Sequence, residues 1–298
     1  MSVVIVNPAS AGGNTGDAWP QIASDLRSQF GPFRVVFTSK RGDAAALAGD
    51  AARKGAKLII ACGGDGTVSE VANGILASGR DVELGILPSG TGGDFRRTLE
   101  IPSQSRAAAR SLSTGRTVKI DVGRVSFIDQ NGNEAMRYFV GVASCGMSTK
   151  VIERVKTDEI SFAASLLQTA IRTEPTRLVV QLDDSSERHL VVLNLCIANA
   201  RYFGGGMKIA PDAKLTDGKF DVVSVGDLSA LKIFASAPRI YTGSHLSMPE
   251  VSHALARKII VRPHDRNSEV ALEVDGELPG KLPATFQIIP KALRVRTG

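Results

Sequence analysis

A glycine-rich segment, Gly63-Gly64-Asp65-Gly66-Thr67, has the residue types and spacing most suited to chemistry in this chain. It follows residues 58–62, an apolar run that predicts a buried strand, and it precedes a stretch that predicts a helix. Glycines let the backbone approach a ligand closely, and the first amides of a helix have no intrahelical partner. These amides and the helix dipole favour an anion such as a phosphate over a tight turn without a ligand. Thr67 is expected to cap this helix or to contact a phosphate.

Two further loops of small residues follow strands in the same way. Residues 7–13 come after the apolar run 3–6, and residues 88–94 come after the strand expected at 84–87. Thr38 ends the strand expected at residues 34–38. Its hydroxyl either reaches a base or ribose, or simply belongs to a β-former at a strand end. Carboxyl ends of parallel strands share one edge of a sheet, where ligands bind. The three loops therefore predict a nucleotide site at that edge.

Other catalytic patterns are missing from the sequence. There is no G-x-x-x-x-G-K-[ST], H-E-x-x-H or G-x-S-x-G, and residues 64–69 only approximate G-x-G-x-x-G. The four histidines have no metal-ligand spacing, and the three cysteines are far apart in apolar runs. This cysteine usage indicates a reducing cytoplasm rather than a disulfide framework.

The order of elements predicts two domains. Strands and helices alternate up to about Asp121, which predicts an α/β domain with a parallel sheet at residues 1–122. Residues 123–298 contain turn signals typical of hairpins and predict a β-rich, antiparallel domain. The last strand, residues 286–295, is compatible with either domain. The hairpin turns are expected at Asn131-Gly132, residues 183–187, Asp217-Gly218 and Asp275-Gly276, and the two helices of this half at residues 160–171 and 230–241.

Composition adds limits on partners. The 298 residues include 36 Lys and Arg against 30 Asp and Glu, a net charge of +6 spread along the chain. No compact basic block with interleaved aromatics appears, so a nucleic-acid partner is not expected. No apolar stretch reaches the roughly 20 residues that span a bilayer. A lipid substrate would then be reached from the membrane surface.

Together these motifs resemble the diacylglycerol kinase catalytic-domain family, which includes bacterial soluble lipid kinases and the sphingosine and ceramide kinases. The resemblance rests on Asn7-Pro8, residues 63–67 and residues 90–95, and it continues in chain order through residues 199–206, Pro211, Asp217-Gly218 and Asp275-Gly276-Glu277. It implies a nucleotide domain like that of NAD kinase and phosphofructokinase, a β-rich second domain, and an active site between them.

The resemblance also implies roles for individual residues, with ATP and Mg²⁺ as cofactors. The implied proton acceptor is Glu277, with Asp275 as its close partner. Asp65 would hold the nucleotide's magnesium or orient the acceptor hydroxyl. A structural magnesium would be held by Asp217 and the backbone oxygens of Lys214 and Lys219. The implied nucleotide contacts are Asn7, Pro8, Ala9, Ser10, Gly12, Thr38, Gly63, Gly64, Asp65, Gly66, Thr67 and Thr91.

Two positions depart from the family pattern, which usually has Asn where Gly93 stands and often Gly where Ala11 stands. The missing Asn side chain would remove a hydrogen bond in the phosphate loop or near the lipid headgroup.

The sequence is thus interpreted as a cytoplasmic, ATP-dependent lipid kinase that contacts the membrane transiently and acts on a lipid such as diacylglycerol; a homodimer is compatible with it. Residues 160–171 and 231–240 either line an apolar groove for the lipid or form core faces. The alternatives are NAD kinase-like phosphorylation of a soluble nucleotide hydroxyl and a nucleotide-binding regulator without catalysis.

Overall fold

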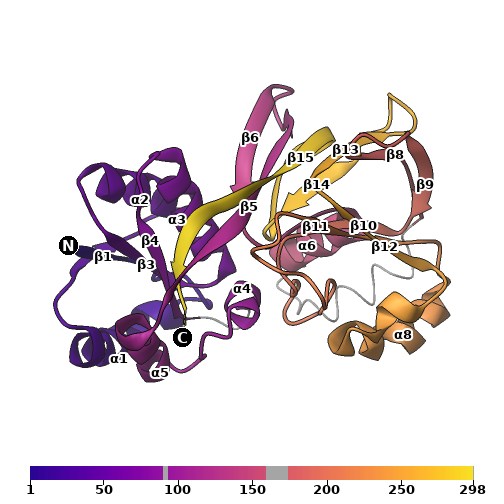
Figure 1. Ribbon diagram of the computed structural model, residues 1–298. Coiled ribbons are helices and arrows are strands. Elements are labelled where there is room, and N and C mark those ends of the chain that lie inside the picture. The colour runs from indigo at the N-terminus through magenta and orange to yellow at the C-terminus, as the bar shows by residue number, and fades with distance from the viewer. Residues whose placement is uncertain (90–92, 159–173, 298) are drawn as a thin grey trace. The chain divides into compact units, whose positions relative to one another are not determined.

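A computed structural model of the chain describes residues 1–89, 93–158 and 174–297 (Figure 1). The chain forms two compact units. Unit 1 comprises Met1–Val122 and Pro290–Gly298, and unit 2 comprises Gly123–Ile289. Among the described residues, no helix combines the length and apolar character needed to cross a bilayer.

Unit 1 is built on a parallel sheet of five strands in the order β15-β4-β3-β1-β2. The central strands are short apolar runs buried along most of their length, as expected when helices cover both faces of a sheet. The end of β15 joins this sheet beside β4 through Arg294 and Val295. The side chains of Arg294 and Glu83 on β4 also form an ion pair at 2.6 Å. The strands are β1 (Ser2–Val6), β2 (Arg34–Phe37), β3 (Leu58–Gly63), β4 (Glu83–Pro88) and β15 (Glu277–Arg296).

Helices cover this sheet on both sides. α2 (Asp43–Arg53) packs against α3 (Asp65–Ala77), and α1 (Asn14–Phe30) packs against α5 (Ser105–Thr114), on the opposite face (Figure 1). Gly74 permits the close approach of α2 and α3, because a Cβ there would lie 2.1 Å from the carbonyl oxygen of Ala45. A fifth, short helix, α4 (Asp94–Thr98), follows the loop after β4.

Unit 2 consists mainly of antiparallel strands. One run has the order β12-β11-β10-β7-β14-β15, and β15 also pairs with β13, which continues through β8 to β9. β5 (Thr117–Asp129) forms a hairpin with β6 (Glu134–Phe139) and pairs with β15. The remaining elements are β7 (Val142–Gly146), α6 (Met147–Asp158), β8 (Thr176–Leu182), β9 (Arg188–Val192), β10 (Asn194–Ala198), β11 (Phe220–Val225), α8 (Ala230–Thr242), a 3₁₀ turn (Ser244–Ser247), β12 (Val251–Ala256), β13 (Lys258–Pro263) and β14 (Ala271–Val274).

The core of unit 2 contains three fully buried phenylalanines. Phe139 stacks on Phe220 with ring centroids 5.5 Å apart, and it meets Phe286 edge-on at 6.3 Å. Such pairs are the preferred arrangements of aromatic rings. The three come from β6, β11 and β15, so the cluster joins strands from distant parts of the chain.

The expected α/β and β-rich architecture is confirmed. Hairpins do form at Asn131-Gly132, at residues 183–187 and at Asp275-Gly276. The hairpin expected at Asp217-Gly218 is wrong, because this dipeptide lies at the end of the long connection from β10 to β11. The helix expected at residues 160–171 lies outside the described residues, whereas the helix expected at residues 230–241 is α8.

Candidate active site

Ser10 ties together the three loops at the carboxyl edge of the unit 1 sheet. Its hydroxyl accepts a hydrogen bond from the Gly64 amide (3.0 Å) and donates one to the Ser89 carbonyl (2.9 Å). Ser89 Oγ also contacts the hydroxyl of the fully buried Thr15 at 2.7 Å. One side chain after β1 thereby fixes the backbone after β3 and after β4.

The beginning of α3 is open to an anion. Its N-cap residue, Gly64, provides no side-chain hydrogen bond, so the first amides of the helix remain donors without an intrahelical acceptor. The expected capping by Thr67 is wrong: Thr67 is buried, and its hydroxyl accepts from Asn7 Nδ2 at 3.0 Å. This contact needs a glycine at position 63, because a Cβ there would lie 2.5 Å from Thr67 Oγ1.

Asp65, the first residue of α3, holds the loop that leads into α4. Its carboxylate accepts three backbone hydrogen bonds, from Gly93 (2.8 Å), Asp94 (3.0 Å) and Phe95 (3.1 Å). The α4 N-terminus is therefore capped by a charge from a neighbouring helix, the favourable sign for a helix dipole. A carboxylate has about four acceptor positions, so three amide bonds leave capacity for one more contact.

Gly93 occupies a backbone conformation that explains its residue type. Its φ is +72°, in the left-handed region that glycine and asparagine adopt most readily. An added Cβ would approach the side chain of Arg96 at 2.5 Å. Glycine therefore fits this backbone conformation, but it lacks the Asn side chain that the family pattern usually has here.

Of the other expected nucleotide residues that the structure describes, Thr38 follows β2 and the rest lie after β1 or β3. Thr38 directly follows β2, is nearly buried, and donates its amide to the Val6 carbonyl at 2.9 Å beside the end of β1. Asn7 Oδ1 accepts from the Ala9 amide, and the Pro8 carbonyl accepts from Gly16. Gly12 is part of a left-handed run, and Gly66 lies in the first turn of α3. Thr91 lies outside the described residues.

In unit 2, Asp275 has a structural role in the β14–β15 turn. Asp275 and Gly276 both have positive φ, as a two-residue hairpin of type I′ requires. The Asp275 carboxylate accepts from the amides of Val140 (3.1 Å) and Gly141 (2.9 Å). The buried Asn199 donates its side-chain amide to the Val140 carbonyl at 3.0 Å. The corner between β6 and β7 is thus held from two sides, and Glu277 begins β15 directly after the turn, half-buried.

A buried polar network extends from this turn into unit 2. The Gly276 amide donates to Glu273 Oε1 at 2.6 Å, and Glu273 Oε2 accepts from Ser144. Ser144 Oγ contacts Ser148 Oγ at 2.7 Å, and Ser148 donates to Asn194 Oδ1 at 2.9 Å. Glu273 is only 3 % exposed. The carboxylate of Glu273 is therefore linked through the hydroxyls of Ser144 and Ser148 to Asn194 in the interior of unit 2.

Ser148 and Asn194 line a mostly apolar cavity of about 110 Å³ in unit 2. The other polar residues of its wall are Ser236 of α8 and the buried His245. His245 Nε2 donates to the Ile209 carbonyl at 3.0 Å, and burial lowers the pKa of its ring. The lining residues include Met147, Leu193, Phe203, Met207, Ile233, Ala237, Ile240 and Val251.

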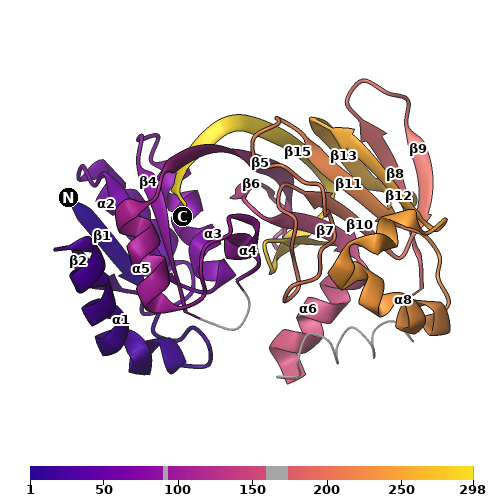
Figure 2. The ribbon, with the colours of Figure 1, turned by 60° about the horizontal axis from the view of Figure 1, so that its bottom comes forward.

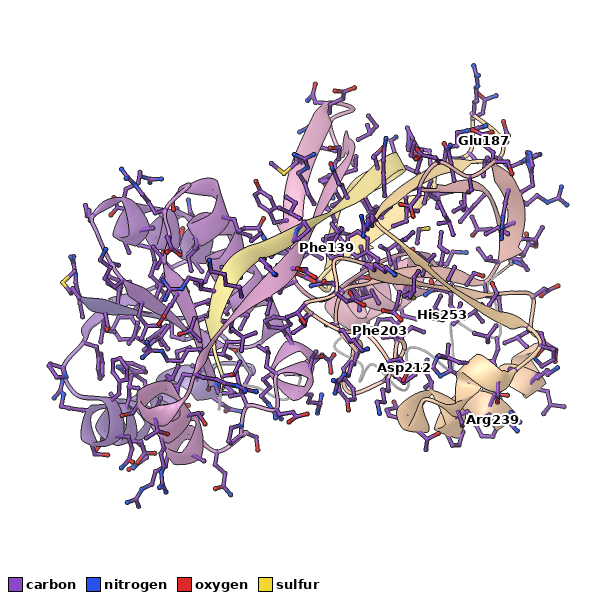
Figure 3. The ribbon with its side chains drawn as sticks, viewed as in Figure 1. Phe139, Glu187, Phe203, Asp212, Arg239 and His253 are labelled. Carbon is purple, nitrogen blue, oxygen red and sulfur yellow. The ribbon has the colours of Figure 1, made fainter. Side chains whose placement is uncertain are left out.

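The structural metal site expected from the family resemblance would fall on the segment around Asp217. Asp217 is exposed and accepts from the Lys219 amide at 3.1 Å in an Asx turn. Asp212 and Asp217 both raise the pKa of Asp221, after the larger effect of burial, while His253 Nε2 contacts Asp221 at 2.7 Å (Figure 3). In residues 1–89, 93–158 and 174–297, no three His, Cys, Asp or Glu side chains converge on a metal position. A hard cation such as Mg²⁺ would therefore be bound near Asp217 by one carboxylate together with backbone carbonyl oxygens.

Several residues of the site were not predicted. Ser89 and Thr15 connect the loops, and Glu273 and Ser144 connect the turn to the cavity. Only Glu273 gave a signal, as a charged residue between the apolar Leu272 and Val274 of a short strand. Serine and threonine are common in loops, so their type alone did not distinguish Ser89 and Thr15.

A parallel α/β unit with loops of small residues at one sheet edge, followed by a β-rich unit with an acidic turn, is the arrangement expected from the family resemblance. Known proteins with similar sequences identify the family. Residues 1–125 match the family model "Diacylglycerol kinase catalytic domain", and residues 140–297 match "YegS C-terminal NAD kinase beta sandwich-like domain". The chain belongs to the diacylglycerol kinase catalytic-domain family, which implies a kinase and, with it, the use of ATP.

Curated relatives agree with this assignment. The chain is 32 % identical over 262 residues to a diacylglycerol kinase of Mycobacterium tuberculosis, covering 85 % of this chain and 81 % of the relative. It is 30 % identical over 303 residues to a diacylglycerol kinase of Staphylococcus haemolyticus, covering 99 % and 87 %.

Solved structures share the fold. A crystal structure of a diacylglycerol kinase from Bacillus anthracis has a TM-score of 0.75 at 23 % identity, covering 100 % of this chain and 97 % of that one. A second crystal structure from the same organism has a TM-score of 0.81 at 24 % identity, covering 100 % and 95 %.

Proposed function

We propose that this protein is an ATP-dependent lipid kinase that transfers the γ-phosphoryl group to a hydroxyl of a membrane lipid such as diacylglycerol. The observation that carries the proposal is the set of loops joined by Ser10, beside an α3 N-terminus that has no side-chain cap. Backbone donors held in this way are suited to a triphosphate. The relatives named as diacylglycerol kinases support a lipid as the acceptor.

Phosphoryl transfer depends mainly on positioning and charge neutralisation, because its transition state is loose. The hydroxyl oxygen of the lipid forms a bond to the γ-phosphorus, the bond from that phosphorus to the β–γ bridging oxygen breaks, and ADP leaves. We propose that Glu277 accepts the hydroxyl proton. Asp275 is a weaker candidate, because its carboxylate already accepts two backbone amides of the β6–β7 corner.

We assign Asp65 a positioning role with respect to the nucleotide. Its three bonds to residues 93–95 keep the loop after β4 next to α3, and its remaining capacity suits a water bound to magnesium. Bound Mg²⁺ would supply charge neutralisation for the phosphates. A second, structural Mg²⁺ would be held by Asp217 with the backbone oxygens of Lys214 and Lys219.

The apolar cavity of unit 2 supports a lipid as the acceptor. Its wall is mostly apolar, and Ser148 in that wall is linked through Ser144 and Glu273 to the turn that precedes Glu277. We propose that an alkyl part of the lipid enters this cavity. The protein would then act in the cytoplasm and contact the membrane during turnover.

ADP release measured with three acceptors and one control tests the proposal. The acceptors are diacylglycerol in vesicles, phosphatidylglycerol in vesicles and NAD, and the control contains no acceptor. We expect release with a lipid, little release with NAD or without an acceptor, and loss of the signal on chelation of Mg²⁺. Release with NAD alone would favour a soluble nucleotide hydroxyl as acceptor. Nucleotide binding without release under any condition would indicate a regulator without catalysis.

A further inference from the structure

Helix α8 carries apolar side chains on two sides. Ile233, Ala237 and Ile240, spaced by four and three residues, face the cavity of unit 2. Ile240 also packs on a core cluster formed by β7, β10, β11 and the connection that follows β10. In Figure 2 the ribbon of α8 lies below β10 and β12. This side of the helix is accounted for by packing within unit 2.

A second side of the helix, next to the first, is apolar and exposed. Leu231 is 79 % exposed, Phe234 60 % and Tyr241 47 %, and Pro238 is exposed between them. Their spacing of three, four and three residues places the four on one stripe of the helix. Eight large hydrophobic side chains are exposed among the described residues, and three of them lie on this helix. Clustering of this kind marks an interaction surface, whereas single exposed side chains do not.

The charges beside the stripe indicate the partner. α8 contains no Asp or Glu, and its two cations, Lys232 and Arg239, are seven residues apart and therefore lie on one border of the stripe. Lys232 also pairs with Glu250, whereas Arg239 is exposed in the last turn (Figure 3). An exposed apolar stripe bordered by cations is typical of helices that lie in the interface of an anionic bilayer.

We propose that the outer face of α8, formed by Leu231, Phe234, Pro238 and Tyr241, inserts into the headgroup–acyl boundary of an anionic bilayer. The inference deepens the proposed function and rests on it for the membrane as source of substrate. The inner face of the same helix lines the apolar cavity. Docking by α8 therefore brings that cavity to the surface from which the lipid leaves the bilayer.

Vesicle sedimentation of the full chain tests the docking surface. The vesicles contain phosphatidylcholine and phosphatidylglycerol at about 3:1, or phosphatidylcholine alone. We expect the wild type to prefer the anionic vesicles. Phe234→Ser should lower partitioning by on the order of tenfold, and Leu231→Ser/Phe234→Ser by more, because each buried apolar side chain contributes about that factor. Val191→Ser, at a 55 % exposed position on β9, is the matched control and should bind like wild type.

Two substitutions at Arg239 measure the electrostatic contribution to vesicle binding. Arg239→Gln should lower binding to the anionic vesicles several-fold, with little effect on neutral vesicles, and Arg239→Lys should restore it. Circular dichroism of each variant checks that α8 still forms.

The outcomes separate docking from catalysis. If the α8 variants keep wild-type activity on lipid in detergent micelles but lose it on vesicles, the docking surface is supported. Wild-type protein that fails to bind anionic vesicles, or variants that bind as well as wild type, would overturn it. So would a loss of dimer mass in the variants with unchanged vesicle binding, because the face would then cover a second copy of the chain. Binding through α8 without ADP release for any lipid would retain the docking surface and reject the kinase proposal.

Discussion

At the scale of single residues, Asp65, Glu70 and Asp275 are among the acids whose carboxylates accept backbone amides. Asp65 receives three amides at the start of α4, and Glu70 receives those of Gly42 and Ala44 at the start of α2. Asp275 receives two at the β6–β7 corner. Asp65 and Glu70 both belong to α3, so this helix caps two neighbouring helices. The local structure therefore requires the negative charge of these three acids, whether or not they also take part in catalysis.

Asp65→Asn tests the positioning role. An amide group offers one oxygen and an NH₂ donor to three N–H groups, so at least one amide loses its acceptor. We expect the free energy of unfolding of unit 1 to fall by about 1–3 kcal/mol. We also expect the KM for ATP to rise about tenfold. Chemical denaturation and ADP-release kinetics measure these effects. Asp50→Asn, at a surface ion pair with Lys54, should change neither, and unchanged stability of Asp65→Asn would refute the positioning role.

Glu277→Gln and Asp275→Asn separate the two acids of the turn. If Glu277 accepts the proton, its replacement should lower kcat by about 10²–10⁴ without changing stability. Asp275→Asn keeps a residue that tolerates φ of 49° but weakens the corner, so we expect a stability loss of about 1–2 kcal/mol and a smaller fall in kcat. The opposite pattern, with kcat lost only in Asp275→Asn at unchanged stability, would exchange the roles.

At the scale of elements, the nucleotide loops are positioned by contacts among themselves. The loops after β1, β3 and β4 meet because parallel strands end at one edge, but their conformation depends on Ser10, Asn7 and Asp65. In unit 2, α8 has a comparable dependence on its neighbours. It is held by its inner face and by the 3₁₀ turn that contains His245.

Ser10→Ala removes the hydroxyl that joins the loops. The Gly64 amide and the Ser89 carbonyl each lose a partner, at a cost of about 1 kcal/mol. We expect a several-fold higher KM for ATP with little change in kcat, because in the proposed mechanism the loops bind phosphate and Glu277 accepts the proton. Ser10→Thr, which keeps the hydroxyl, should restore much of the affinity. Equal KM values for wild type and Ser10→Ala would contradict the assignment.

His245 should make unit 2 less stable in acid. Burial lowers the pKa of its ring, so in the folded state it stays neutral below the pH at which it protonates when unfolded. The unfolded state then binds the extra proton, and stability present above pH 6.5 is lost as the pH falls. For one proton the loss between pH 6.5 and 5 is at most about 2 kcal/mol. His245→Gln keeps a donor for Ile209 and should show a shallower decrease in thermal stability; an identical slope would rule out His245 as the cause.

At the scale of the whole molecule, the three free cysteines are probes for the unfolding of each unit. Cys62 lies in unit 1, and Cys145 and Cys196 lie in unit 2; all are buried. Burial raises the pKa of Cys62 and of Cys145 to about 12 and raises that of Cys196 as well, with a smaller contribution from Glu273 to the latter two.

We therefore expect native protein to resist alkylation by iodoacetamide at pH 8, where only the thiolate reacts. In guanidinium chloride, mass spectrometry of the labelled peptides should show Cys62 reacting as unit 1 unfolds, and the other two as unit 2 unfolds. Rapid labelling of Cys62 without denaturant would show that the interior of unit 1 is more accessible than its burial indicates.

The sequence by itself determined most of the elements and the loops of small residues that follow the strands of unit 1. Apolar runs such as residues 58–62 and turn pairs such as Asp275-Gly276 encode local structure through burial and φ preference, and both signals lie within a few residues. The sequence also assigned the family through motifs in chain order. It placed a hairpin wrongly at Asp217-Gly218, because an Asx turn and a hairpin turn use the same residue pair.

Only the tertiary structure decided which partners the polar side chains have. Asp65 meets residues 93–95, Ser10 meets Gly64 and Ser89, and Glu273 meets Ser144 across 129 positions of sequence. None of these pairs has a fixed spacing, because each depends on strand order and on helix packing. The two faces of α8 show the same limit: its periodicity predicts a helix, but only packing determines which apolar side is buried and which remains available to a membrane.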